Sequence, residues 1–251
     1  IVTDNGGRKP ISELYVYYDE SYRSDYRDVV VAVGARALDQ EYYIQQLVNA
    51  LEYRGLKNIT MVNAVQLASH LGADVAGGPY SKGLVVISGA LPDTVYTGNA
   101  TDTILRWIGG GGSLYWAGNL VGAEYSTRNS IVPVTSDYQT LFLGAQCLNT
   151  IVDEGDPAYT DQAFSDIKAN GYRDDLSLMN NRVRYAVDTA KLSAKTSDYM
   201  AAGYGEKSYA SITFVKNGDG MVCVMGGDYS NNQRSDLAQV IAAGLCYSSE
   251  E

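Results

Sequence analysis

The sequence predicts an α/β fold in which a doubly wound, mainly parallel sheet carries helices on both faces. Short apolar runs alternate with segments of helical periodicity through residues 11–121, which is the order that a parallel sheet requires. The links between these segments are short, and an apolar hairpin and an apolar helix close the chain. At 251 residues the chain can bury one large core, so we expect a single domain over residues 1–251.

The strands of the first half are expected at five places. Residues 14–18 alternate and are rich in Tyr, which indicates an edge strand, whereas residues 29–33 form a continuous β-branched run typical of a buried parallel strand. Further apolar runs lie at residues 59–62, 83–87 and 113–116. With right-handed crossovers, these runs predict a flavodoxin-like sheet of about five or six mainly parallel strands.

Three helices are expected between these strands. They cover residues 40–54, which end before Gly55, then residues 64–71, and then residues 101–108. Four glycines follow the third helix at residues 109–112. They leave a helix instead of entering one, and no Lys-Ser/Thr follows them, so we interpret them as a helix stop and a tight turn and not as a phosphate loop.

The second half divides into an irregular part and a regular end. The core is expected at about residues 11–121 and 209–247, and an irregular, partly β insertion at about residues 122–208. Within the insertion, residues 140–149 are helix or strand and residues 197–207 are loop-like. At the end, a Gly-containing turn predicts a hairpin over residues 209–225, and residues 236–245 are typical of an apolar helix.

Charge and composition exclude several classes of function. The net charge of −10 and the pI near 4.6 argue against nucleic acid and against anionic membrane surfaces, because no basic patch is available to bind phosphate. The chain has no apolar run of transmembrane length, so no membrane insertion is expected. Its 21 Tyr side chains combine an apolar ring with a polar tip, which suits surfaces and rims that contact partners or sugars and also tolerates simple exposure.

Cysteine usage and short motifs bear weakly on the compartment. Cys147, Cys223 and Cys246 lack metal-ligand spacing, and they are compatible with one disulfide and one thiol or with three thiols. Asn58 and Asn99 each begin an Asn-X-Thr glycosylation sequon. We expect an extracellular or cell-surface location and no metal or cofactor.

Three segments carry a resemblance to a known family. They are residues 83–93, 107–119 and 218–245, which read GLVVISGALPD, WIGGGGSLYWAGN and GDGMVCVMGGDYSNNQRSDLAQVIAAGL. Together they resemble the class I glutamine amidotransferase-like superfamily, in its trehalose-utilisation-like and β-galactosidase-trimerisation-like branches. The resemblance implies a nucleophile elbow after the strand at residues 113–116.

The elbow lacks the cysteine nucleophile that active members of the superfamily use. Active members of the superfamily place a Cys at the elbow and supply a His and a Glu later in the chain, whereas here the elbow holds Ala117 and Gly118. The one His, His70, lies upstream. Without a thiol and a base to activate it, amidotransfer by the family mechanism is not expected, and no catalytic residue is assigned.

A ligand site is predicted at the carboxyl edge of the sheet, where loops after parallel strands gather. Small residues at positions 34–36, 88–93, 117–119 and 226–228 permit a ligand to approach the backbone. Among them, Asp93, Asn119 and Asp228 offer polar contacts, and Tyr115 or Trp116 offers a stacking face. The ligand is expected to be a carbohydrate or another small molecule.

Two functions from different classes follow. The first is a non-catalytic domain of a larger secreted or cell-surface protein, which serves in ligand binding, in self-association or in assembly with other domains. The alternative is a carboxylate-dependent hydrolase acting on carbohydrate or amide substrates, with Glu20, Glu124 and Asp228 as its candidate acids. Convergence of two of these carboxylates in a deep cleft favours the hydrolase.

Overall fold

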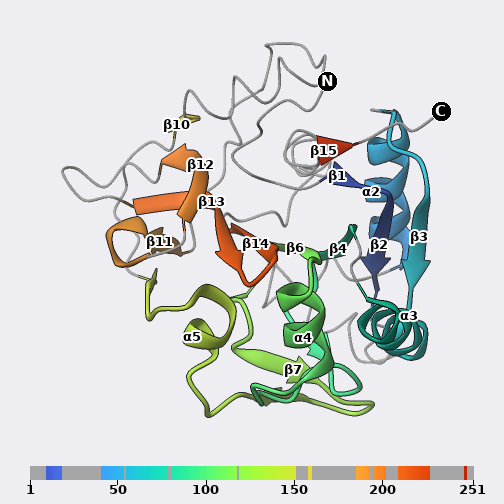
Figure 1. The fold of residues 1–251 in the computed structure, drawn as a ribbon, viewed down its shortest axis with the longest axis horizontal. Coiled ribbons are helices and arrows are strands. Elements are labelled where there is room, and N and C mark those ends of the chain that lie inside the picture. Colours follow the sequence, from blue (N-terminus) through green and yellow to red (C-terminus); the bar gives the residue numbers. More distant parts are fainter. Residues whose placement is uncertain are drawn as a thin grey trace.

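The computed structural model describes residues 10–18, 41–53, 55–78, 81–117, 119–150, 158–159, 185–192, 195–201, 209–226 and 246–247 (Figure 1). The helices are α2 (Glu41–Tyr53), α3 (Ala64–Gly77), α4 (Thr103–Gly109), α5 (Tyr138–Leu143) and the 3-10 helix η2 (Thr189–Lys191). The strands are β1 (Pro10–Ile11), β2 (Glu13–Tyr17), β3 (Ile59–Val62), β4 (Lys82–Val86), β5 (Leu91–Pro92), β6 (Ser113–Ala117), β7 (Glu124–Ser126), β8 (Ile131–Pro133), β9 (Leu148–Asn149), β10 (Ala158–Tyr159), β11 (Ala186–Asp188), β12 (Lys195–Ala201), β13 (Tyr209–Asn217), β14 (Gly220–Met225) and β15 (Cys246–Tyr247).

Five parallel strands form the centre of the main sheet in the order β3-β2-β4-β6-β14. Numbered along the chain, this order is 2-1-3-4-5, the order of a flavodoxin-like sheet. In Figure 1 the series of neighbouring strands begins with β3 and β2 on the right and ends with β14 near the middle. The predicted α/β, mainly parallel fold is therefore confirmed.

The first strand is not the edge strand that its Tyr-rich alternation predicted. β2 pairs with β3 on one side and with β4 on the other, and residues 14–17 are all buried. The prediction is wrong because Tyr15 and Tyr17 are fully buried and do not face solvent. Both rings pack into the core, since helices cover both faces of the sheet.

Helices cover opposite faces of the parallel strands. On one face, α2 contributes Ile44 and Leu47 to a cluster that includes Leu14 and Val16 of β2. On the other face, α3 and α4 pack against side chains that point the opposite way along the same strands. This second cluster includes Tyr15, Tyr17, Leu67, Leu71, Leu84, Val86, Ile104, Trp107, Leu114 and Trp116. The strand alternation of period two thus separates the core into two layers.

Antiparallel strands extend the sheet beyond β14. β13 and β14 form the predicted hairpin, with Asn217 paired to Gly220, and β12, β11, β10 and β9 continue the pairing. The loop expected at residues 197–207 is wrong in its first part, because residues 195–201 form β12 and pair along β13. Strand content in the region expected to be a partly β insertion agrees with the prediction.

The four-glycine segment ends α4 as predicted. Gly110, Gly111 and Gly112 donate their backbone N–H groups to Arg106, Ile108 and Trp107, respectively, and so satisfy the last carbonyls of the helix. The Gly112 carbonyl then accepts from Met221 of β14, so the turn also fixes the start of that strand.

Several expectations lie outside the described residues, namely the strand at 29–33 and the helix at 236–245. Within the described part of the chain, no helix is long and apolar enough to cross a membrane.

Candidate functional site

The loops after β4 and β6 meet at the carboxyl edge of the parallel strands. Gly89 follows β4 with a φ of 75°, and a Cβ atom at that position would lie 2.6 Å from the backbone nitrogen of Asn119. Only glycine combines this left-handed backbone with such a close approach. The loops after β4 and β6 are therefore in contact with each other beyond the strand ends.

Two predicted ligand contacts lie exposed at this edge. Asn119 is exposed directly after β6, where the contact with Gly89 holds its backbone. Asp93 is exposed in the turn that follows β5, and its backbone N–H donates to the Ser126 carbonyl at 2.8 Å. The structure thus brings the loops after β4 and β6 together. Asp228 and the loop at residues 34–36 lie outside the described residues.

The stacking face expected of Trp116 or Tyr115 is not exposed. The Trp116 ring is fully buried, and its indole Nε1 donates to the Asn119 carbonyl at 2.6 Å. Tyr115 points to the opposite layer of the core, where its ring lies 6.1 Å from that of Phe214. Because helices or packed segments cover both faces of β6, neither ring can stack on a ligand. Trp116 instead fixes the turn that presents Asn119.

A further contact closes the same edge at the end of β14. The Tyr185 N–H donates to the Gly226 carbonyl at 3.2 Å, and the Tyr185 carbonyl lies so close to the Gly226 Cα that no Cβ atom fits between them. The Tyr185 side chain is buried with no hydrogen-bond partner for its hydroxyl, and burial raises its pKa. This edge is therefore packed by backbone contacts.

The described thiols are buried in the core, and the imidazole of His70 lies on α3. Cys147 and Cys223 are buried, and burial raises the pKa of Cys147 to about 11, with a further contribution from the charge of Asp188. A thiol with this pKa is protonated and unreactive at neutral pH. His70 lies on α3, where its ring centre is 4.9 Å from that of Tyr15.

A buried polar network that the sequence analysis missed lies at the opposite, amino edge of the strands. The Lys82 Nζ, at the start of β4, donates to Asp74 at 2.7 Å and to Tyr15 at 2.8 Å, and it pairs with Glu13 at 3.1 Å. Trp107 of α4 donates its indole Nε1 to Asp74 at 3.0 Å. The network therefore ties α3 and α4 to β2 and β4.

Within this network, Lys82 and Tyr15 both keep their protons at neutral pH. Burial disfavours the charged ammonium, but the hydrogen bonds to Asp74, Tyr15 and Glu13 outweigh it and raise the pKa of Lys82. Burial raises the pKa of Tyr15 to about 12. Neither group exchanges a proton near neutral pH, so the network stabilises the fold. The sequence signal for it was Asp74, an acid at helical spacing from the buried Leu67 and Leu71.

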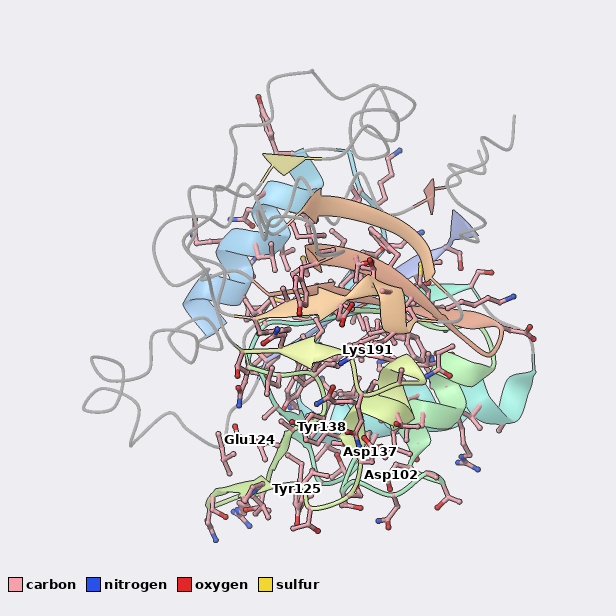
Figure 2. The ribbon with its side chains drawn as sticks, turned by 90° about the vertical axis from the view of Figure 1, so that its left-hand side faces the viewer. Asp102, Glu124, Tyr125, Asp137, Tyr138 and Lys191 are labelled. Atoms are coloured by element: carbon pink, nitrogen blue, oxygen red, sulfur yellow. The ribbon has the colours of Figure 1, made fainter. Side chains whose placement is uncertain are left out.

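Acidic side chains on the side that carries α5 and β7 have local structural roles (Figure 2). Asp137 caps α5, and hydrogen bonds from Thr140 and Gln146 lower its pKa. Asp102 accepts from the backbone N–H groups of Thr97 and Asn99 at 2.6 and 2.9 Å. Glu124, a candidate acid of the alternative hydrolase, is half-buried in β7. The other two candidates, Glu20 and Asp228, lie outside the described residues.

No cluster that could hold a metal ion occurs within the described ranges. There, no three His, Cys, Asp or Glu side chains converge with suitable geometry. The exposed side chains of Asn119 and Asp93 can both make hydrogen bonds.

Comparisons with known proteins find similarity only at the level of the fold. No protein-family model matches the chain, and a search of the curated proteins gave no match. Similar solved structures include a cold-adapted β-galactosidase from Rahnella sp. R3, at 14% identity and a TM-score of 0.49, with 93% of this chain and 31% of that chain covered. They also include a β-galactosidase from Halorubrum lacusprofundi, at 16% identity and a TM-score of 0.49, with 96% and 32% covered. An exo-β-1,4-mannosidase from an Opitutaceae bacterium matches at 15% identity and a TM-score of 0.45, with 95% and 37% covered.

The chain spans about a third of the length of these solved structures. Identities and TM-scores of this size assign it to no family. The resemblance to the glutamine amidotransferase-like superfamily therefore stays a prediction from the sequence.

Proposed function

We propose that this chain is a non-catalytic domain of a larger secreted or cell-surface protein and that it binds a small, hydroxyl-rich ligand such as a carbohydrate. The observation that carries the proposal is the close approach of Gly89 and Asn119, which brings the loops after β4 and β6 together at the carboxyl edge. In an open α/β sheet, ligands bind outside the carboxyl ends of the strands, where these loops lie. Here the loops that follow β4 and β6 present the exposed polar side chains of Asp93 and Asn119, which we call the rim.

The rim supplies groups suited to hydroxyl recognition. The Asn119 side-chain amide offers both donors and an acceptor, and the Asp93 carboxylate offers acceptors. Both side chains are exposed, and the backbone of each is fixed by a packed contact or a hydrogen bond. A site whose polar groups are held in place before the ligand arrives loses less entropy on binding.

Thermal-shift screening of the full chain against a panel of monosaccharides and oligosaccharides tests the proposal. We expect at least one saccharide to raise the unfolding temperature of the wild type, and Asn119→Trp to abolish that shift by covering the rim. Ser69→Trp is the matched control, because Ser69 is exposed on α3 and belongs to neither of the loops after β4 and β6. It should leave the shift unchanged.

Two results would overturn the ligand site. One is a shift that survives in Asn119→Trp, because the saccharide would then bind elsewhere. The other is the loss of the shift in both variants. The introduced Trp would then act by destabilising the whole fold and not by covering the rim. A panel without any shift would contradict saccharide binding and leave assembly as the remaining non-catalytic role.

A further inference from the structure

The chain contains two Asn-X-Thr sequons, and the fold places them in different environments. Asn58-Ile59-Thr60 leads into β3, and Asn99-Ala100-Thr101 lies between β5 and α4. A transferase that reads this motif must reach both the Asn amide and the Thr hydroxyl, since the motif requires both residues. The accessibility of all three residues therefore decides which sequon can be modified on the folded chain.

The residues of the first sequon are hydrogen-bonded to the sheet or lie within it. The Asn58 side-chain amide donates to the Ser12 carbonyl at 3.2 Å, and the backbone carbonyl of Asn58 accepts from the Leu14 N–H at 3.1 Å. The other two residues, Ile59 and Thr60, belong to β3 and pair with Leu14 and Tyr15 of β2. Both are half-buried. A transferase could bind all three residues of this sequon only if β3 detached from the sheet.

The second sequon is free of helix and strand. Asn99, Ala100 and Thr101 are all exposed. The Asn99 side-chain amide donates to the Thr97 hydroxyl at 2.8 Å, within the same exposed turn, and the backbone of Asn99 is held by Asp102 at 2.9 Å. Figure 2 shows Asp102 on the side of the molecule that carries α5 and β7. Rotation of one side chain frees the Asn99 amide without opening any strand.

We propose that Asn99 is an N-glycosylation site of the folded chain and that Asn58 is not. The co-substrate is an oligosaccharide linked through pyrophosphate to a lipid. The Asn99 side-chain nitrogen attacks the anomeric carbon of the first sugar, and the bond from that carbon to the pyrophosphate oxygen breaks. The nitrogen loses one proton, and the lipid pyrophosphate leaves with the bonding electron pair.

The test incubates the purified, folded full chain with an oligosaccharyltransferase and its lipid-linked oligosaccharide, followed by peptide mapping with mass spectrometry. We expect glycan occupancy at Asn99 to exceed that at Asn58 by at least tenfold. Thr101→Ala should abolish the modification at Asn99, whereas Thr101→Ser should retain it because the hydroxyl remains. Synthetic peptides covering residues 55–63 and 96–104 serve as controls, and both should be modified because neither is folded.

Modification of Asn58 to a similar extent in the folded chain would overturn the inference, since it would show that β3 does not protect its sequon. An unmodified Asn99 in the folded chain would overturn it as well, whether or not the peptide of residues 96–104 is accepted. Occupancy at Asn99 that persists in Thr101→Ala would show a reaction that does not read the sequon.

Discussion

At the scale of single residues, Gly89 closes the carboxyl edge of the sheet. Its φ of 75° is a conformation that side chains with a Cβ atom disfavour, and the close Asn119 nitrogen leaves no space for a methyl group. The packing of the candidate rim therefore depends on the absence of one side chain.

We predict that Gly89→Ala lowers the free energy of unfolding by about 1–3 kcal/mol, because it adds backbone strain and a steric clash with Asn119. Gly72→Ala is the matched control: Gly72 lies in α3, and nothing would contact its Cβ within 4 Å. That variant should be stabilised by about 0.5–1 kcal/mol, because Ala favours a helix over Gly. Urea unfolding measures both, and equal changes in the two variants would contradict the account.

The Asp74 carboxylate anchors the buried network at the amino edge. Asp74→Asn removes the charge opposite Lys82 and leaves the ammonium with Glu13 as its ionic partner. We predict a loss of about 1–3 kcal/mol in the free energy of unfolding, because the half-buried ammonium loses one charged partner. Asp93→Asn, at an exposed position, should change it by less than about 0.5 kcal/mol. A similarly small loss for Asp74→Asn would show that the pair behaves like a surface ion pair.

At the scale of elements, α3 begins with a complete capping box. The Asn63 side chain accepts from the backbone of Val65 and Gln66, and the Gln66 side chain accepts from the Asn63 N–H at 3.0 Å. We predict that Asn63→Ala lowers the free energy of unfolding by about 1 kcal/mol, because two backbone donors lose their acceptor.

Asn63→Asp is the control for the cap. A carboxylate at this position accepts the same hydrogen bonds and interacts favourably with the helix dipole, so stability should be kept or slightly raised. Chemical denaturation of both variants distinguishes the cap from other roles of the side chain. A loss in Asn63→Asp as large as that in Asn63→Ala would show that the amide has another function.

The order of the elements was predictable from sequence, but the neighbours of a strand were not. The runs at residues 59–62, 83–87 and 113–116 are apolar because both faces of their strands are covered, and each forms a parallel strand as predicted. For β2, the Tyr side chains gave no sign that two strands flank it, because a Tyr ring suits a core as well as a surface. β12 was missed since its polar residues pair by backbone along β13.

The candidate site was predictable in part for the same reason. Small residues after β4 and β6 indicated that the loops would meet, which Gly89 and Asn119 confirm. Which side of β6 each ring faces depends on register, and whether a face is covered depends on packing between distant segments. The sequence therefore could not reveal that both Tyr115 and Trp116 are buried. It also could not reveal that Asp74 and Lys82 meet.

At the scale of the whole molecule, several buried groups bind their protons more tightly in the folded state. Burial raises the pKa of Cys147 to about 11 and that of Tyr15 to about 12, and hydrogen bonds raise the pKa of Lys82. The unfolded chain releases these protons at lower pH, so the stability they contribute is complete below about pH 9 and falls as the pH rises.

We therefore predict that the urea midpoint of unfolding falls steadily between about pH 9 and pH 11. Cys147→Ala should flatten the early part of this fall, because it removes the group with the lowest ordinary pKa among the three. Measuring the midpoint of both proteins across this range checks the prediction. A wild-type midpoint that stays constant from pH 8 to pH 11 would contradict it.

The central claim is that the carboxyl edge binds without catalysing, and a turnover measurement tests it most directly. The full chain is incubated with a panel of chromogenic glycosides and amides beside its Glu124→Gln and Asp228→Asn variants. The account predicts no turnover above the uncatalysed rate in any of the three proteins. Turnover by the wild type that is lost in either variant would contradict the account and establish the carboxylate-dependent hydrolase in its place.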